Sequence, residues 1–243
     1  MSSIRERAER RFERLRRQAA GSVDADESAP APSGWCIATV ARLVRNEGPI
    51  SAIQAIQSRL SSVGELYPYP PESLHLSLLG CTQREPERPA ASGRRIDDIA
   101  RAVDRVTENV GPVRVELAAL NLVGSQFFVE VLTDDRAWRS LRERLASELT
   151  GIGENPLTYP DPEPMHVNIA RVLRLDAPSE RRRLLVQDRP AVDVTLDLAT
   201  IELVITDFVL SPATTTVVHT RHLGRLPRGE AGPGSATASA GSA

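Results

Sequence analysis

The sequence predicts an α+β fold in which antiparallel sheets are backed by helices. Segments with the alternating pattern of strands are interleaved along the chain with segments of helical periodicity. The clearest helix, 96–110, stands directly before two alternating segments, 113–117 and 127–131, whose short connection is typical of a hairpin. Two further segments, 74–78 and 165–169, share one alternating pattern with a histidine in the same place. Together these three observations indicate the α+β class.

Composition narrows the class of protein. The 243 residues accommodate one large domain or two small lobes, and the apolar share of 41% is ordinary for a globular chain. The net charge of −2 gives no overall attraction to nucleic acid or membranes. Cys36 and Cys81 make neither a disulfide framework nor a metal-ligand spacing, so we expect reduced, buried thiols in a cytoplasmic protein. The absence of lysine suggests the GC-rich coding of a bacterium.

A membrane span is not expected, because no apolar run approaches the roughly 18 residues that a span needs. A signal peptide is not expected either, because the N-terminus is rich in Arg and Glu and lacks an apolar core. The N-terminal segment predicts a helix over 4–19, and Ser3 with Glu6 suggests a capping box at its start. Arginines occupy most of the helix outside its apolar stripe. We weigh two interpretations: a solvated helix that docks loosely on the domain or frays in solution, and an arm that contacts RNA phosphates or a partner.

The ends of the chain are expected to lie outside the folded domain. The composition of 21–34 is typical of a flexible linker, and the Gly/Ala/Ser-rich tail from Gly229 predicts disorder. We therefore divide the chain into a helical arm with its linker at 1–33, a folded domain at 34–224 and a disordered tail at 225–243. Both ends are expected to be dispensable for folding and activity.

The first part of the domain leads to the first histidine segment. A strand is predicted over 35–43, and a helix with Ile53, Ile56 and Leu60 at helical spacing follows Pro49. The segment 67–71 is too rich in proline for regular structure in our interpretation.

The second part repeats this plan. A helix is predicted over 138–149 with Asp134 or Asp135 as its cap, and the Pro-rich loop 151–164 leads into the second histidine segment. A helical turn is expected near 181–185. Three strand candidates close the domain: 192–196, 201–206 and 214–220.

The two histidine segments echo each other residue by residue: Leu74-His75-Leu76-Ser77-Leu78 and Met165-His166-Val167-Asn168-Ile169. On a strand, successive side chains point to opposite faces, so His75 and Ser77 share one face while the leucines share the other. The same parity groups His166 with Asn168. Each strand thus buries an apolar face and presents an imidazole beside a small hydrogen-bonding side chain.

The segments that precede the two motifs are also alike. A glutamate lies three residues before each histidine, at Glu72 and Glu163, and the three tyrosines of the chain, Tyr67, Tyr69 and Tyr159, fall in these lead-ins. The tyrosines either stack on a nucleobase or pack the loops against the sheet. The glutamates either orient the imidazoles or are exposed loop acids, and we favour exposure.

The pattern His-hydrophobic-Ser/Thr-hydrophobic, given twice about half a chain apart, resembles the 2H phosphoesterase superfamily, which includes 2′-5′ RNA ligase-like proteins and cyclic nucleotide phosphodiesterases. The resemblance covers about residues 35–223. It implies two pseudo-symmetric lobes of antiparallel sheet, each with one histidine strand facing a central cleft. The sequence departs from the pattern at Asn168, where the family usually carries Thr or Ser. An amide can still donate a hydrogen bond to a phosphate oxygen.

The chemistry expected of this arrangement is proton transfer by two imidazoles, which titrate near neutral pH. The resemblance implies that His166 is the base toward water and His75 the acid toward the leaving 2′-oxygen. Ser77 and Asn168 can donate to the non-bridging phosphate oxygens. Neither a cofactor nor a metal is required. The structural alternative is a pair of core histidines with satisfied hydrogen bonds.

We therefore expect a monomeric, metal-independent phosphodiesterase that acts on RNA or nucleotides with a 2′,3′-cyclic phosphate or a 2′-5′ linkage. One alternative within the superfamily is a 3′-end RNA exonuclease. Another is a non-catalytic module that binds nucleotide or RNA, which Asn168 favours. His219 and His222 lie outside the motif and are expected at an edge or surface, although Arg221 beside them could meet a phosphate.

Overall fold

The computed structural model describes residues 3–21, 34–44, 47–134, 136–157, 165–175, 179, 182–207 and 210–224. The helices are α1 (Ile4–Gly21), α2 (Glu47–Leu60), α3 (Arg94–Thr107) and α4 (Ala137–Gly151), with short turns η1 (Pro71–Ser73) and η2 (Arg183–Asp188). The strands are β1 (Trp35–Arg42), β2 (Gly64–Pro68), β3 (His75–Gly80), β4 (Val113–Val123), β5 (Gln126–Leu132), β6 (His166–Leu175), β7 (Ala191–Leu198), β8 (Thr200–Asp207) and β9 (Thr216–His222).

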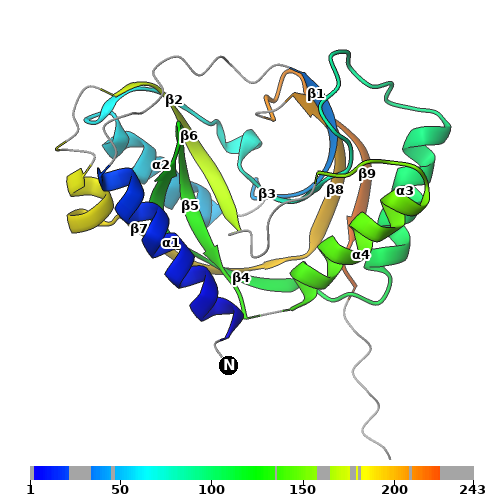
Figure 1. The fold of residues 1–243 in the computed structure, drawn as a ribbon, viewed down its shortest axis with the longest axis horizontal. Helices are drawn as coiled ribbons and strands as arrows, with labels where there is room; N and C mark the ends of the chain where they lie inside the picture. The colour runs from blue at the N-terminus through cyan, green and yellow to red at the C-terminus, as the bar shows by residue number, and fades with distance from the viewer. Residues whose placement is uncertain are drawn as a thin grey trace, which may run out of the picture.

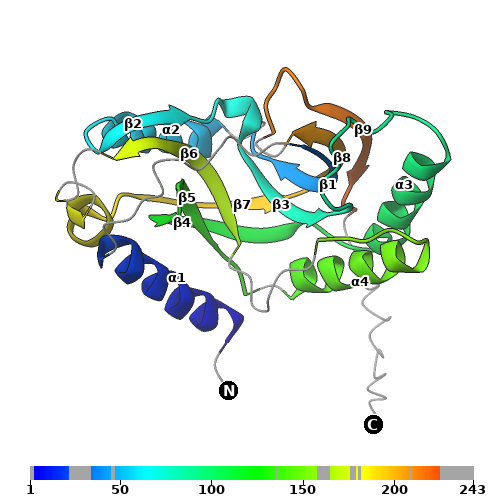
Figure 2. The same cartoon turned by 45° about the horizontal axis from the view of Figure 1, so that its top comes forward.

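The strands form two antiparallel sheets, which agrees with the predicted α+β class (Figure 1). The four-stranded sheet has the order β3-β1-β8-β9, and the five-stranded sheet has the order β2-β6-β5-β4-β7. The helices α3 and α4 lie side by side and contact the four-stranded sheet, whereas α2 contacts the five-stranded sheet (Figure 2). One main hydrophobic core includes buried residues of both sheets and of these three helices.

The hairpin predicted between 113 and 131 is β4 and β5. Gly124 sits at its turn with φ of 54°, a left-handed conformation that glycine adopts without a steric penalty. Along β5, Phe127 and Val129 belong to the main core, while the alternate residue Phe128 belongs to a separate cluster beneath α1. The five-stranded sheet is therefore covered by α2 on one face and partly by α1 on the other.

The helix α1 begins with the predicted capping box. The amide of Glu6 donates to Ser3 Oγ at 3.1 Å, and the amide of Ser3 donates to Glu6 Oε2 at 3.0 Å. The expectation of a loosely docked helix is wrong, because Phe12 is 0% exposed and packs on Phe128 with ring centroids 6.1 Å apart. Its apolar stripe is thus buried on the sheet.

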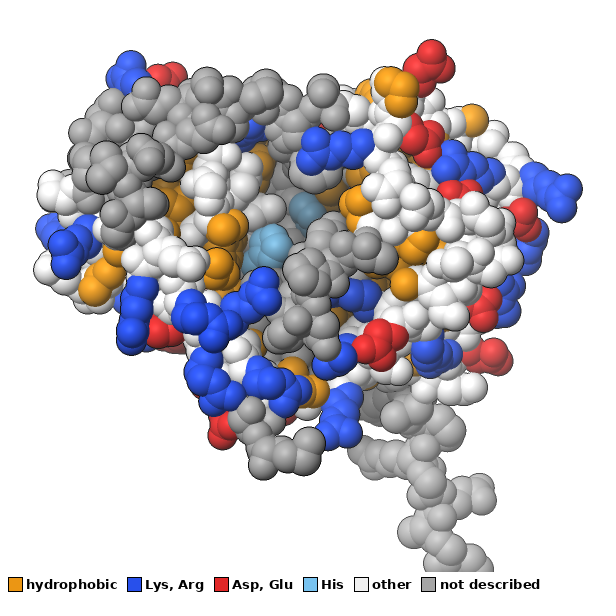
Figure 3. All heavy atoms as spheres, viewed as in Figure 1, with side chains coloured by type: hydrophobic (Ala, Val, Ile, Leu, Met, Phe, Trp, Pro, Cys, Tyr) orange, Lys and Arg blue, Asp and Glu red, His pale blue; other side chains and the backbone are white. Residues whose placement is uncertain are grey.

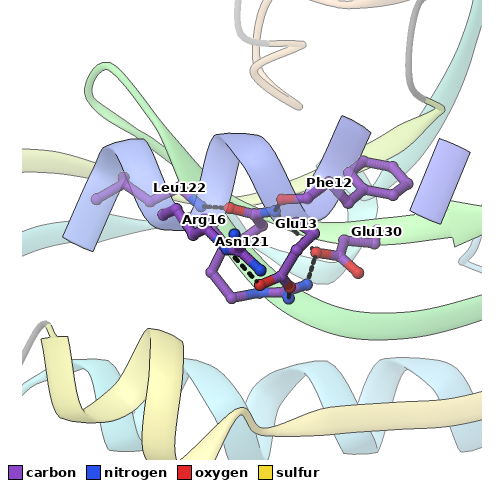
Figure 4. Close-up of polar contacts among 7 residues, drawn as sticks. Phe12, Glu13, Arg16, Asn121, Leu122 and Glu130 are labelled. Carbon is purple, nitrogen blue, oxygen red and sulfur yellow. Dashed lines mark hydrogen bonds and ion pairs between the residues drawn. The ribbon is translucent and has the colours of Figure 1, made fainter. Parts of the chain in front are cut away.

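A polar network under α1 also holds the helix on the strands β4 and β5 (Figure 4). Arg16 is 4% exposed, and its guanidinium forms a buried ion pair with Glu130 on β5. Asn121 Nδ2 on β4 donates both to Glu130 Oε1 at 2.8 Å and to the carbonyl oxygen of Phe12 at 2.9 Å. The stripe in the sequence reveals the buried side of the helix, but not that Arg16 belongs to it.

Two local predictions need correction. The segment 67–71 was expected to be irregular, yet Tyr67 and Pro68 end the edge strand β2, where a proline without an N–H is tolerated. The predicted aspartate cap of α4 is also wrong for the part that the structure describes, because Arg136 occupies the N-cap position and makes no side-chain capping bond. Asp135 lies outside the described residues.

Candidate functional site

The strand β3 presents the first motif as its parity predicts. Leu74, Leu76 and Leu78 are buried in the main core, whereas His75 is half-buried and Ser77 is exposed. Directly opposite residues of antiparallel strands share a face. The cross-strand neighbours of His75 and Ser77 on β1 are Arg42 and Val40, which places a guanidinium on the same face as His75.

The strand β6 presents the second motif in the same way. Val167 and Ile169 are fully buried behind the strand, and His166 and Asn168 are half-buried on the other face. Their cross-strand neighbours on β5 are Glu130 and Phe128.

Each histidine strand also carries a β-bulge at the last residue of its motif. In β3 the register shifts so that Leu78 has no partner between Ser77 and Leu79, and in β6 Ile169 has none between Asn168 and Ala170. A bulge bends a strand and increases its local twist, and bulges are common beside active sites because they redirect side chains. The echo seen in the sequence therefore extends to the backbone.

The two histidines come from different sheets and lie close enough to interact. β3 is an edge strand of the four-stranded sheet, β6 is an inner strand of the five-stranded sheet, and the two strands are in contact. A charge on His166 lowers the pKa of His75 through space. Figure 3 shows histidine side chains, in pale blue, inside a hollow on the face where β6 and β3 approach each other.

The surroundings of His75 favour its neutral form. Burial is the main cause that lowers its pKa from 6.5 to about 4, and Arg42 contributes in the same direction as His166. The carbonyl oxygen of Ser73 lies 2.7 Å from Nδ1 and opposes the shift. Because a carbonyl oxygen can only accept, Nδ1 carries the proton and Nε2 is left with a lone pair in the neutral ring.

His166 lies next to the polar network under α1. Its ring contacts the edge of Phe128 with centroids 5.3 Å apart, and Glu130 is its direct cross-strand neighbour. Burial raises the pKa of Glu130, while Arg16 and Asn121 oppose that rise. The ionised state of Glu130 beside His166 therefore depends on a cation that comes from α1.

Ser77 and Asn168 keep their donors available. Within the described ranges neither side chain has a hydrogen-bond partner, and both lie on the same face as the histidine of their strand. A hydroxyl and an amide beside the two imidazoles are suitable donors to an anionic oxygen.

The tyrosines of the first lead-in have different environments. Tyr69 is 5% exposed, and its hydroxyl donates to Gln126 Oε1 at 2.9 Å, so it packs the loop against the sheet and offers no open face to a base. Tyr67 is 44% exposed and contacts Tyr69 edge to face. Tyr159 and Glu163 lie outside the described residues, and Glu72 is exposed in η1, as expected.

Other titratable groups are placed away from the two motifs. His219 and His222 lie on the edge strand β9, where His219 Nε2 is 2.9 Å from Asp104 Oδ1. Cys36 and Cys81 are buried free thiols, as predicted, and burial raises their pKa to about 11 and about 12. No cluster of three or more His, Cys, Asp or Glu suited to a metal is found among the described residues.

Sequence reasoning missed Arg42 and Glu130, the cross-strand neighbours of the two histidines. Both occur within mainly apolar segments, where a charged residue is unusual and indicates a buried partner. That signal is present in the sequence. The partners are Glu202 for Arg42 and Arg16 for Glu130, far away along the chain, and no local pattern identifies them.

Comparison with known proteins gives similarity in structure only. No family model matches the sequence, and no curated protein matches it. TT0787 from Thermus thermophilus is similar with a TM-score of 0.58 and 17% identity, over 77% of this chain and 97% of that chain. Apo LigT from E. coli is similar with a TM-score of 0.53 and 13% identity, over 79% of this chain and 99% of that chain.

A protein described as a phosphoesterase is similar with a TM-score of 0.50 and 14% identity, over 79% of this chain and all of the other. These structures belong to the 2H phosphoesterase superfamily. In the described part of the chain, no helix is long and apolar enough to cross a membrane. The fold that the repeated histidine motif implies, that of the 2H phosphoesterases, is the fold of this chain.

Proposed function

We propose that this protein is a metal-independent phosphodiesterase that acts on a 2′,3′-cyclic phosphate or a 2′-5′ linkage of RNA or nucleotides. The observation that carries the proposal is the pairing of His75 with His166, which come from two sheets and interact electrostatically. Opening a cyclic phosphate needs one group that removes a proton from water and another that protonates the departing oxygen. A pair of imidazoles meets both needs.

In the proposed reaction, His166 takes a proton from water as the water oxygen bonds to phosphorus. His75 gives the proton on Nε2 to the ribose oxygen as its bond to phosphorus breaks, and the product is a phosphomonoester. Each proton transfer typically contributes about 10²- to 10⁴-fold in rate. Ser77 Oγ and Asn168 Nδ2 donate to the non-bridging oxygens, where negative charge develops.

This order of roles places a condition on His75. Its pKa of about 4 in the free protein means that Nε2 carries no proton at neutral pH. The negative charge of a bound phosphate favours the protonated imidazole and raises its pKa. His75 therefore becomes the acid only when the substrate phosphate lies against its ring.

The structural neighbours support a nucleotide as the ligand of the hollow. LigT has been crystallised with 3′-AMP, with ATP and with NADP+. All three ligands combine a nucleoside with a phosphate. We infer that the hollow of this chain also takes a phosphate that carries a nucleoside.

The test is hydrolysis of 2′,3′-cyclic AMP in buffer that contains EDTA. We expect turnover with a bell-shaped pH profile, and a loss in kcat of at least about 10²-fold for His75→Ala and for His166→Ala. The double variant should lose less than the product of the two single losses, because the pair works as a unit. His222→Ala, which removes an imidazole from the edge strand β9, is the matched control and should keep its activity.

Two outcomes would contradict the proposal. Activity that survives loss of either histidine but disappears with chelator would rule out the two-histidine mechanism. With an RNA strand as substrate, a mononucleotide released with a cyclic phosphate would identify transesterification by a 3′-end exonuclease in place of hydrolysis.

A second candidate is a module that binds nucleotide or RNA without turnover. Asn168 favours it, because the second motif lacks the hydroxyl of the usual Thr or Ser. If the wild-type protein binds 3′-AMP without turning over the cyclic nucleotide, and Asn168→Thr gains turnover, the binding module is correct.

Under the enzyme proposal, Asn168→Ala and Ser77→Ala should each lower kcat by about 10- to 10³-fold, because each removes one donor.

A further inference from the structure

The helix α1 is a concentration of positive charge on a chain with a small negative net charge. It carries seven arginines and three glutamates, whereas the whole chain has a net charge of −2. Figure 3 shows Arg side chains, in blue, gathered over α1 beside the hollow that holds the histidines. A field of this kind attracts anions to one face of the molecule.

Some of these arginines have acidic partners. Arg5 pairs with Glu116 at 2.7 Å, Arg16 pairs with Glu130, and Arg17 pairs with Glu13 at 3.0 Å. Three others do not: in the described part of the chain, no acidic partner is found for Arg10, Arg11 and Arg14. We call these three residues the α1 basic surface.

The packing of α1 turns this surface away from the sheet. Phe12 and Arg16, four residues apart, point into the protein and define the buried side of the helix. At about 100° per residue, Arg10 and Arg14 fall on the opposite side and Arg11 on a flank. Two ring contacts, from Phe12 to Phe128 and from Phe128 to His166, connect the helix to the hollow.

A groove also follows the helix. It has a volume of about 730 Å³ and lies between α1 and the strands β4 and β7. Arg10, Arg14 and Arg17 line it from the helix, and Arg189 lines it from the far side. Five arginines and five carboxylates line the groove, so its charge is balanced as a whole. Within it, Arg10 and Arg14 have no acidic partner among the described residues, and their guanidinium groups are left to bind an anion.

The chemistry of this surface favours the phosphate backbone of an RNA strand over a lipid surface or an apolar protein surface. An amphipathic helix binds a membrane through its apolar face, and that face of α1 is already packed on the sheet. What is left is guanidinium groups, which bind phosphate oxygens through paired N–H donors. An RNA strand is a row of phosphates that can run from the hollow onto the helix.

We propose that the α1 basic surface binds the phosphate backbone of an RNA strand whose reacting end lies between His75 and His166. This inference rests on the proposed function and specifies its substrate class. The substrate is an oligonucleotide, since a strand with several phosphates can contact the guanidinium groups of α1 while its reacting end lies in the hollow. The α1 basic surface thus sets a preference for an oligonucleotide over a mononucleotide.

The test compares 2′,3′-cyclic AMP with a short oligonucleotide that ends in a 2′,3′-cyclic phosphate. We expect the wild-type protein to prefer the oligonucleotide at least about tenfold in kcat/KM, and the triple variant Arg10→Gln/Arg11→Gln/Arg14→Gln to lose most of that preference. With about 0.7 counterions released per phosphate contact, the salt dependence of log KM for the oligonucleotide should fall in slope by about 2. Circular dichroism checks that α1 is retained, as Gln is a good helix former.

The matched control removes three exposed arginines from the helices behind the other sheet, in the variant Arg94→Gln/Arg101→Gln/Arg139→Gln. It lowers the net charge by the same amount and should keep the oligonucleotide preference. Equal kcat/KM for the two substrates in the wild-type protein, or an equal loss of preference in the control, would overturn the inference.

A binding measurement separates this inference from the proposed function. Fluorescence anisotropy of a labelled oligonucleotide with a 3′-phosphate end needs no turnover. Weaker binding in the α1 triple variant than in its control supports the docking surface, whether or not the wild-type protein hydrolyses a substrate. A wild-type protein that hydrolyses neither substrate would refute the proposed enzymatic activity. Equal binding in the two variants refutes the docking surface alone.

Discussion

His75 shows how one side chain can be held ready for proton transfer by its neighbours. The carbonyl oxygen of Ser73 fixes the proton on Nδ1, while burial, His166 and Arg42 all disfavour a second proton on the ring. The same residue must be protonated if it is to act as the acid. The ligand therefore has to supply the negative charge that the free site lacks.

We expect NMR titration of His75 to give a pKa near 4 in the free protein and a higher pKa with 3′-AMP bound. Because the folded pKa lies below the ordinary 6.5, the folded state binds fewer protons than the unfolded state between these values. Stability contributed by neutral His75 is complete above 6.5 and is lost as the pH falls toward 4. His75→Gln should not show this loss.

A pKa of His75 that stays low with ligand bound would reverse the assignment of roles. His75 would then be the base and His166 the acid, and the acidic limb of kcat/KM would follow the low pKa of His75.

At the scale of elements, α1 is part of the folded domain and not an accessory arm. Phe12 fills a cluster on the sheet, and Arg16 neutralises Glu130 directly opposite His166. We expected residues 1–33 to be dispensable, and the burial of Phe12 and Arg16 argues against that expectation for α1. Removal of the helix would leave an apolar surface and a buried carboxylate without its cation.

The pair Arg16–Glu130 gives a sharp test. Arg16→Met should lower the free energy of unfolding by about 3–5 kcal/mol, because it leaves a buried carboxylate without its partner. The loss should be largest at neutral pH and should shrink as the pH falls, since the pKa of Glu130 is raised by burial and protonation removes the unpaired charge. Urea unfolding at several pH values measures both effects.

Two variants control this experiment. Arg17→Met changes an arginine whose side chain is 77% exposed, and it should cost about 1 kcal/mol or less. Arg16→Met/Glu130→Gln removes both charges and should recover part of the stability. If Arg16→Met and Arg17→Met lower the free energy of unfolding equally, the buried ion pair does not stabilise the packing of α1 on the sheet.

At the scale of the whole molecule, the two sheets share one hydrophobic core although each supplies its own histidine. Leu203 of β8 and Leu120 of β4 are both fully buried in that core, one in each sheet. A shared core couples the two halves, so the spacing between His75 and His166 depends on the packing of both sheets. The shape of the hollow thus depends on both sheets together.

We expect the two sheets to unfold in a single transition. Leu203→Ala and Leu120→Ala should each cost about 2–5 kcal/mol and shift the same midpoint in thermal melts followed by circular dichroism. Leu173→Ala, at an exposed position of β6, is the matched control and should change stability little. Two separated transitions in either core variant would mean that the sheets are independent units.

Apart from the edge strand β2, the local patterns of the sequence determined which segments become the main strands and helices, and which side of each is buried. The period of two around His75 and His166, the stripe of α3 and the turn at Gly124 report backbone geometry and burial within a few residues. For that reason the fold class and the faces of the two motifs could be predicted. The repeated motif also pointed to two histidines, His75 and His166, whose strands are in contact.

Only the tertiary structure decided which faces meet. Periodicity shows that Phe12 is buried but not that Phe128 and Arg16–Glu130 lie beneath the helix, because those partners are more than a hundred residues away. Likewise, Tyr69 has the local sequence of a loop residue, yet it is buried and its hydroxyl donates to Gln126 of β5, 57 residues away. Strand order, register and long-range ion pairs are set by how elements pack together, and a local pattern carries no information about a distant partner.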